Sequence, residues 1–168
     1  MKIGILSDTH GWLDERIFHH FNDCDEIWHS GDVGDISIID QLIKFKPTIG
    51  VYGNIDGTDM RAALPNTQLF EREGLKIYIT HIAGTPKRYE KGIISKLKEE
   101  KPNILVCGHS HILKVMTDKN FNNMLYINPG AAGRHGFHKI RTIIKLELKN
   151  KSIAAMQAIE LGARSKVL

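Results

Sequence analysis

Metal-binding side chains recur along this sequence, each directly after a short strand-like segment. These segments end at Asp8-Thr9-His10, Gly31-Asp32, Gly53-Asn54, His81 and Gly108-His109-Ser110-His111. The set holds two carboxylates, one amide oxygen and four imidazoles, from Asp8, Asp32, Asn54, His10, His81, His109 and His111. Mixed nitrogen and oxygen ligation without thiolate suits Mn²⁺, Fe²⁺, Zn²⁺ or Co²⁺ better than Ca²⁺.

The number of these ligands indicates two metal ions. Seven ligands are too many for one ion that must also bind a substrate, but they suit two ions when one carboxylate bridges them. Two cations about 3.5–4 Å apart can clamp an in-line displacement at phosphorus, and they lower the pKa of a bridging water towards neutrality. The chemistry expected of the set is hydrolysis of a phosphate ester.

A scaffold that gathers strand ends is needed to bring these side chains together. The first third of the chain alternates strand, helix, strand, helix, strand, over residues 2–6, 14–21, 26–29, 37–45 and 48–52. This alternation is typical of α/β folds with parallel strands, whose carboxyl ends form the ligand crevice. The glycines at 31, 53 and 108 allow sharp turns there and let a ligand approach the backbone.

The rest of the chain mixes a hairpin with further strands. Residues 67–72 and 75–80 flank Glu73-Gly74 and predict a β-hairpin, and a helix is expected over 93–100. Further strands are expected over 104–107, 114–118, 124–127, 141–148 and 152–160. With no internal repeat, low-complexity stretch or linker, we expect one α/β domain over residues 1–168 that contains two packed mixed sheets.

In order and spacing, the five motifs resemble those of the calcineurin-like metallophosphoesterase family. The family pattern is D-x-H, G-D, G-N-x-D/E, a lone His and G-H-x-H, and Asn128-Pro129-Gly130 resembles its late N-P-G turn. The short chain resembles the small YfcE-like phosphodiesterase branch. The resemblance implies a four-layer α-β-β-α sandwich of two mixed sheets.

The resemblance also implies how the ligands divide. One metal ion would be held by Asp8, His10 and His111, the other by Asn54, His81 and His109, with Asp32 bridging them. It implies two divalent ions, Mn²⁺ first, with Fe, Zn, Ni, Co or Mg as alternatives. The implied catalytic residues are Asp32, Asn54 and His109: a hydroxide between the ions attacks phosphorus in line, and His109 or His111 helps to stabilise the developing charge.

Two positions depart from the family pattern. Ile55 stands where many members have a histidine that protonates the leaving group, a role typically worth 10²–10⁴-fold in rate. We therefore expect substrates with good leaving groups, or another proton donor such as a metal-bound water, His135 or His138. Residues 82–84 lack the second His or Asp that members often have after the residue that corresponds to His81. Small diesterases often lack the histidine at the position of Ile55, so its absence here favours a phosphodiesterase.

Several polar residues have more than one interpretation. Asp56 could cap the following segment, orient a ligand or contact the substrate. Arg134 and His135 follow the N-P-G turn in a glycine-punctuated loop, and they could bind a phosphate oxygen or simply lie on the surface. His138 belongs to the same loop, and Arg61, after Asn54, is a further candidate for a phosphate contact.

Other residues of the same types are expected to have no part in the site. Asp8 or Asp32, taken alone, could cap a helix, but the four placed histidines argue against this. His19 and His20 lie in an expected helix away from the motifs, on the surface or in packing contacts. His29 is expected to pack inside a strand instead of binding metal.

Composition limits which kinds of binding partner and which cellular compartment are expected. The net charge of +4 favours anionic partners, but no basic tract or aromatic-interleaved run indicates a nucleic-acid groove. The cysteines at 24 and 107 form no CxxC motif, which fits buried thiols in a reducing compartment. With no signal peptide and no apolar stretch near the roughly 20 residues of a membrane span, we expect a cytoplasmic protein that forms a possible homo-oligomer.

The leading hypothesis is a metal-dependent phosphodiesterase that acts on a small phosphodiester. One alternative is a catalytically weak binding scaffold, because a retromer subunit shares the implied fold with a degraded metal site. All seven ligand positions here keep coordinating residue types, which disfavours this alternative. The other alternative is a nuclease, although the chain has no evident DNA-binding extension.

Overall fold

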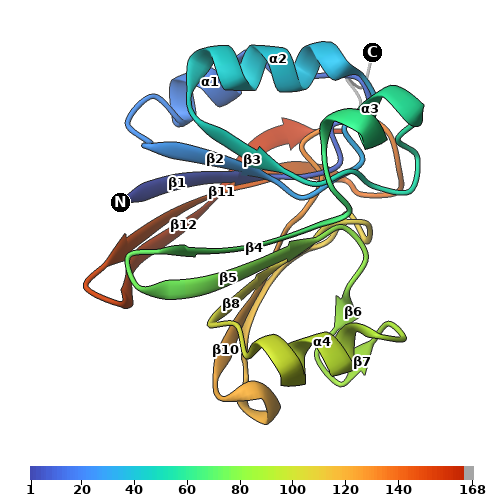
Figure 1. Cartoon of the computed structure of the whole chain (residues 1–168). Helices are drawn as coiled ribbons and strands as arrows, with labels where there is room; N and C mark the ends of the chain where they lie inside the picture. Colours follow the sequence, from blue (N-terminus) through green and yellow to red (C-terminus); the bar gives the residue numbers. More distant parts are fainter. Residues whose placement is uncertain (165–168) are drawn as a thin grey trace.

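The computed structural model describes residues 1–164, which form two five-stranded mixed sheets and a two-stranded hairpin (Figure 1). The first sheet has the order β12 (Ser152–Ala163), β11 (Ile140–Lys149), β1 (Lys2–Leu6), β2 (Glu26–His29), β3 (Thr48–Gly50). The second has the order β4 (Thr67–Arg72), β5 (Leu75–Thr80), β8 (Ile104–Val106), β10 (Met124–Pro129), β9 (Leu113–Asp118). The α/β class with two mixed sheets is thus confirmed.

Helices lie on the outer sides of the two sheets (Figure 1). Beside the first sheet are α1 (Arg16–His20), α2 (Ile36–Phe45) and α3 (Thr58–Ala63), and beside the second is α4 (Ile93–Glu100). A hairpin of β6 (Gly84–Thr85) and β7 (Arg88–Tyr89) lies near α4, and a 3-10 turn, η1, covers Lys119–Phe121. This is the order helix, sheet, sheet, helix of a four-layer sandwich.

Three apolar clusters hold these layers together. The largest lies between the sheets and joins Ile5 and Trp28 of the first to Ile77 and Val106 of the second, all fully buried. A second cluster packs the outer face of the first sheet against α1, α2 and α3, and a third packs Leu97 of α4 against the second sheet. Burial on both faces explains the continuous apolar runs of the central strands.

The parallel strands decide where the site can form. β1, β2 and β3 run parallel in the first sheet, and β5, β8 and β10 run parallel in the second. The carboxyl ends of parallel neighbours meet at one edge, and the loops that follow them carry the motifs. The expected strands and the helices over 37–45 and 93–100 are confirmed within a few residues.

The short elements α3, η1 and the β6–β7 hairpin were not predicted from the sequence. α3 has six residues and buries only Met60, so it offers no helical apolar stripe to detect. β6 and β7 have two residues each, which is too short for an alternating pattern. All of them connect larger elements and leave the sheet order unaffected.

Both cysteines lie in packed parts of the fold. Cys24 and Cys107 are buried and unpaired, and burial raises the pKa of the Cys107 thiol to about 12. Two inert thiols in packed surroundings agree with the expectation from their spacing. Within residues 1–164, every helix is too short or too polar to cross a bilayer.

Candidate metal centre

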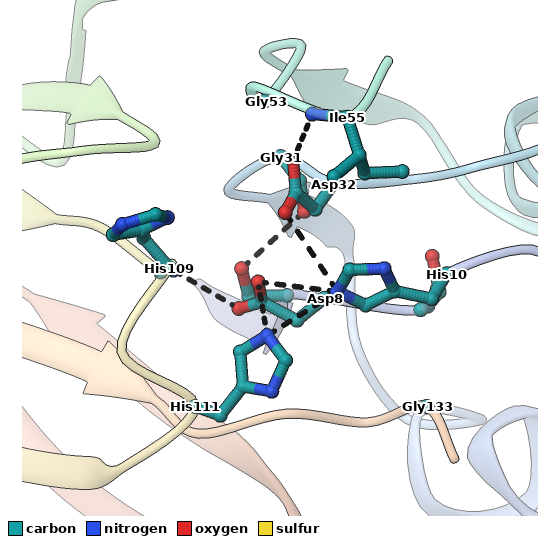
Figure 2. A network of polar contacts seen from close by, with 12 residues as sticks. Asp8, His10, Gly31, Asp32, Gly53, Ile55, His109, His111 and Gly133 are labelled. Carbon is teal, nitrogen blue, oxygen red and sulfur yellow. Dashed lines mark hydrogen bonds and ion pairs between the residues drawn. The ribbon is translucent and has the colours of Figure 1, made fainter. Parts of the chain in front are cut away.

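The motif side chains converge where the carboxyl ends of both sheets meet (Figure 2). The loops after β1, β2 and β3 carry Asp8, Asp32 and Asn54. From the second sheet, His81 follows β5 and His109 follows β8. The structure therefore brings together residues from five loops spread over about a hundred positions of sequence.

A first group consists of Asp8, His10 and His111, whose ligand atoms all lie within 4.8 Å of one another. The Nε2 atom of His111 is 3.2 Å from Asp8 Oδ1 and also 3.2 Å from His10 Nε2. His10 Nε2 is 3.9 Å from the same carboxylate oxygen. Figure 2 shows these three side chains pointing towards one another, as ligands of one ion do.

A second group consists of Asp32, His81 and His109, again with ligand atoms within 4.8 Å. His81 Nε2 is 3.2 Å from Asp32 Oδ1, and His109 Nδ1 is 2.9 Å from Asn54 Oδ1. Asn54 thus lies beside this group.

The Asp32 carboxylate faces both groups. While Oδ1 is near His81, its other oxygen, Oδ2, is 3.7 Å from His10 Nε2 in the first group. Asp32 is also 3% exposed, so its charge is held away from water. A carboxylate with one oxygen towards each group can serve as a bridging ligand.

Two buried ligand atoms of the site lack a hydrogen-bond partner. Among residues 1–164, Asp8 Oδ1 and His81 Nε2 are buried and have no hydrogen-bond partner. Buried polar atoms nearly always have a partner, and leaving one without costs about 1–3 kcal/mol. The Nδ1–H of His81 donates to the carbonyl of Ser30 at 2.7 Å, which leaves the Nε2 lone pair free. Both orphaned atoms can bind a cation, so this donor set fits divalent metal ions.

The local charges also favour a cation. Burial lowers the pKa of His81, but the carboxylates of Asp32 and Asp8 outweigh burial and raise it above its usual value. Burial raises the pKa of Asp32, yet attraction to His81 and the backbone hydrogen bond from Ile55 contribute to holding it below its usual value. Burial lowers the pKa of His10, which keeps its imidazole neutral and able to coordinate.

The backbone of the site is strained. Five of the seven candidate ligands have a positive φ between 47° and 68°, namely Asp8, His10, Asp32, His109 and His111. For residues other than glycine this conformation costs on the order of 1–3 kcal/mol each, although Asp and His tolerate it better than most. Such strain gathers where function requires a particular direction of the side chain.

Glycines allow the close approach that the sequence suggested. A Cβ at Gly53 would lie 2.0 Å from Asp32 Oδ1, so any side chain there would displace this carboxylate. Gly31 has a φ of +99°, and a Cβ at this position would lie 2.6 Å from His81 Nδ1. Both positions therefore need glycine because candidate ligands occupy the space.

Asp56 ties two of the ligand-bearing loops together. Its carboxylate accepts hydrogen bonds from the backbone N–H groups of Val33 at 3.1 Å, Gly34 at 2.8 Å and Gly53 at 2.8 Å. The residue is 4% exposed. Of the interpretations considered for Asp56, the structure favours one that orients ligands over contact with the substrate.

His29 has a similar role that the sequence did not reveal. The expectation that it packs inside a strand is confirmed, because it is fully buried, and burial lowers its pKa to about 4. Its Nδ1 accepts from the N–H of Gly31 at 3.2 Å, so Nε2–H donates to Thr9 Oγ1 at 3.0 Å. The Thr9 hydroxyl then donates to the carbonyl of Val33 at 2.9 Å. This chain connects the loops that carry the two aspartates.

The late loop brings two histidines beside the first group. The ring centroid of His135 is 5.1 Å from that of His10, and His138 lies 5.2 Å from His111. The Nε2–H of His138 donates to the carbonyl of Gly133 at 3.0 Å. These positions keep both histidines within reach of a substrate at the first group.

The two arginines considered as phosphate contacts lie in different places. The guanidinium of Arg134 stacks on Trp12, 3.7 Å from the ring centroid. Arg61 donates from Nε to the carbonyl of Asp56 at 2.7 Å and lies beside Asn54. Arg61 therefore lies closer to the second group, and Arg134 is held against an aromatic ring.

The capping alternative for Asp8 and Asp32 is wrong. α1 begins several residues after Asp8, and Asp35 caps α2 by accepting from the N–H of Ser37. His19 and His20 lie in α1 and belong to neither group.

Comparisons with known proteins identify the family. Residues 1–151 match the family model described as the calcineurin-like phosphoesterase superfamily domain. A probable metallophosphoesterase from Methanocaldococcus jannaschii is 30% identical over 95% of this chain and 82% of that protein. A phosphodiesterase from the same organism is 26% identical over 77% of this chain and 83% of its own length.

Solved structures show the same fold. Protein TM1076 from Thermotoga maritima has a TM-score of 0.71 at 25% identity and covers 95% of this chain and 99% of its own. Vps29 from Entamoeba histolytica in complex with Zn²⁺ has a TM-score of 0.73 at 15% identity. The match covers 96% of this chain and 98% of the Vps29 chain. At that identity, the likeness to Vps29 concerns the fold alone.

Proposed function

The chain belongs to the calcineurin-like phosphoesterase superfamily, and we propose that it is a phosphodiesterase that uses two divalent metal ions to hydrolyse a small phosphodiester. The observation that carries this proposal is the position of Asp32, with one carboxylate oxygen towards each candidate ligand group. The orphaned atoms of Asp8 and His81 support it, since each lacks the partner that a cation would supply. The name of the phosphodiesterase relative supports the choice of a diester.

The proposed ligand sets follow the two groups. Asp8, His10 and His111 would hold one ion, Asn54, His81 and His109 the other, and Asp32 would bind both. Mn²⁺ is proposed first, with Fe, Zn, Ni, Co or Mg as alternatives, because such ligand sets accept several ions. When bound, the ions supply Lewis acidity at the phosphate oxygens and acidify the attacking water.

The side chains around the ions divide the remaining tasks. Buried Asp8 accepts from the backbone N–H of His109 at 3.2 Å and so fixes the second histidine loop. His109 is exposed, so a substrate can reach from solvent the ion that it would hold, and its part in stabilising charge on a phosphoryl oxygen would act through that ion. Asn54 holds this ring at Nδ1. These residues orient the reacting groups in advance of binding.

The position of Ile55 limits the substrates. Its backbone N–H donates to Asp32 Oδ1 at 3.1 Å, but its exposed side chain has no proton to give to a leaving group. Without an acid there, the rate should depend on how stable the leaving group is by itself. His135 and His138 are proposed as alternative donors because their loop lies beside the first group.

The direct test is hydrolysis of bis(p-nitrophenyl) phosphate by the purified protein, with p-nitrophenyl phosphate as the matched monoester. We expect diester turnover that requires Mn²⁺ or another divalent ion, is abolished by a chelator, and exceeds turnover of the monoester. Absence of turnover with every divalent ion tried would contradict the proposed function. Faster turnover of the monoester would contradict the assignment as a diesterase, but the broader assignment as a phosphoesterase would stand.

The scaffold alternative has the fold alone in its favour, through the likeness to Vps29. All candidate ligand positions keep side chains that coordinate metals, and the described geometry brings them together. A nuclease has no specific observation in its favour. The single domain over residues 1–168, the cytoplasmic location and a homo-oligomer stay predictions.

A further inference from the structure

A groove of about 640 Å³ opens directly beside the candidate metal centre. Two of the residues that line it, Asn54 and His81, also belong to the candidate ligand set, so the groove is continuous with the centre. Its volume falls in the range of roughly 300–1,000 Å³ that is usual for small-molecule sites. It has room for one ester arm of a diester whose phosphorus lies at the metal ions.

Arg61 is fixed on the wall of this groove. Its Nε donates to the carbonyl of Asp56 at 2.7 Å, and one terminal nitrogen is 3.4 Å from the carbonyl of Asn54. Its guanidinium carbon lies 4.6 Å from the centre of the Tyr52 ring. These contacts orient the guanidinium, yet they are made with neutral groups, so they leave its charge uncompensated.

The charge balance of the groove is positive. Its lining contains Arg61 and Lys96 and no acidic residue. Lys96 pairs with Glu99 at 3.0 Å on the surface of α4, whereas no acidic side chain in the described part of the chain forms an ion pair with Arg61. An oriented guanidinium with free donors is well suited to a carboxylate or phosphate, which it binds through paired hydrogen bonds.

The rest of the lining suits an organic group. Tyr52, Tyr78, Ile82 and Ile93 provide apolar surface, while Asn66, Thr67 and Thr80 provide polar atoms at intervals. A pocket that is largely apolar with a few placed polar groups is typical of small-molecule recognition. The groove is therefore suited to an organic arm that ends in, or carries, an anionic group.

We propose that this groove binds one ester arm of the substrate, and that Arg61 selects arms that carry a second anionic group. The inference rests on the proposed phosphodiesterase function and narrows its substrate class to diesters with a charged arm. Arg61 acts here as a specificity residue, since it touches the arm and not the reacting phosphorus.

The test uses two diesters that share p-nitrophenol as the leaving group. Their other arms are 4-carboxyphenyl and the nearly isosteric, neutral 4-carbamoylphenyl. The wild-type protein, loaded with Mn²⁺, is expected to show a kcat/KM about tenfold higher for the carboxyl arm, in line with one charge-assisted hydrogen-bonded pair. In Arg61→Gln this ratio should fall to about one, and in Arg61→Lys part of it should be kept.

Arg88→Gln is the matched control, because Arg88 is an exposed arginine outside the groove lining. It should keep both the rates and the ratio of the wild type. A wild-type ratio near one, or equal losses on both diesters in Arg61→Gln, would overturn the inference while the diesterase function stands. Failure of the wild type to hydrolyse either diester with any divalent ion would overturn the function and the inference together.

Discussion

Replacing Asp32 with asparagine should lower kcat/KM for an aryl phosphodiester by more than about 10²-fold, since loss of an outer partner of a metal ligand alone typically costs 10–100-fold. The amide keeps the size of the side chain and removes its charge. In the wild type, one Asp32 oxygen is 3.2 Å from His81 and the other is 3.7 Å from His10. An amide offers one neutral oxygen, so it cannot direct a charged oxygen towards each group.

Asp35→Asn is the control for this substitution. Asp35 is an exposed carboxylate close by in sequence that caps α2, and asparagine caps helices about as well. It should leave kcat/KM unchanged. The assays use saturating Mn²⁺, with circular dichroism to verify that both variants fold. An Asp32→Asn protein as active as the wild type would remove Asp32 from the proposed role.

Divalent metal should stabilise the folded protein strongly. Metal at about 100 times its dissociation constant raises the free energy of unfolding by about 2.7 kcal/mol. For a chain of this length, the melting temperature would then rise by roughly 5–10 °C. The physical source is two buried ligand atoms that lack a hydrogen-bond partner, Asp8 Oδ1 and His81 Nε2, together with the backbone strain around them.

Thermal melts of the protein treated with a chelator, with and without added Mn²⁺, measure this effect. Asp35→Asn should show the full shift and Asp32→Asn a smaller one. A melting temperature that stays constant with Mn²⁺, Fe²⁺, Zn²⁺, Co²⁺ and Ni²⁺ would mean that the site binds no metal in the folded state. That result would also leave the orphaned atoms without a physical account.

Much of the fold could be predicted because its central strands are buried on both faces. Runs such as residues 3–6 and 104–107 contain no charged or polar side chain apart from the Cys107 thiol, and each is followed directly by a glycine or a polar residue. α2 was visible because Ile38, Ile39 and Leu42 form one apolar side. α3 and the β6–β7 hairpin were not, because they are too short to show a period.

The candidate ligands could be found for a related reason. Each is an Asp, Asn or His that follows a short apolar strand-like run, so it can be recognised from its neighbours in the sequence. The sequence left the role of Asp56 open among several and did not reveal the role of His29, because their partners are mostly backbone atoms of residues such as Gly34 and Gly31. Any residue with an N–H can fill that position, so only the folded arrangement reveals the contact.

The groove was invisible in the sequence for another reason. Its wall joins Arg61 to Lys96 and Tyr78, which come from three separate elements. The sequence allowed Arg61 as a phosphate contact because it follows Asn54. The structure adds the neutral anchors that orient its guanidinium and the absence of an acidic residue among those that line the groove.

The central claim is that two metal ions share the Asp32 carboxylate. Equilibrium dialysis against Mn²⁺, followed by elemental analysis of the protein, counts the ions directly. The account predicts two ions per chain for the wild type and fewer for Asp32→Asn at the same free metal concentration. A wild-type protein that binds one ion or none at saturating metal would contradict it.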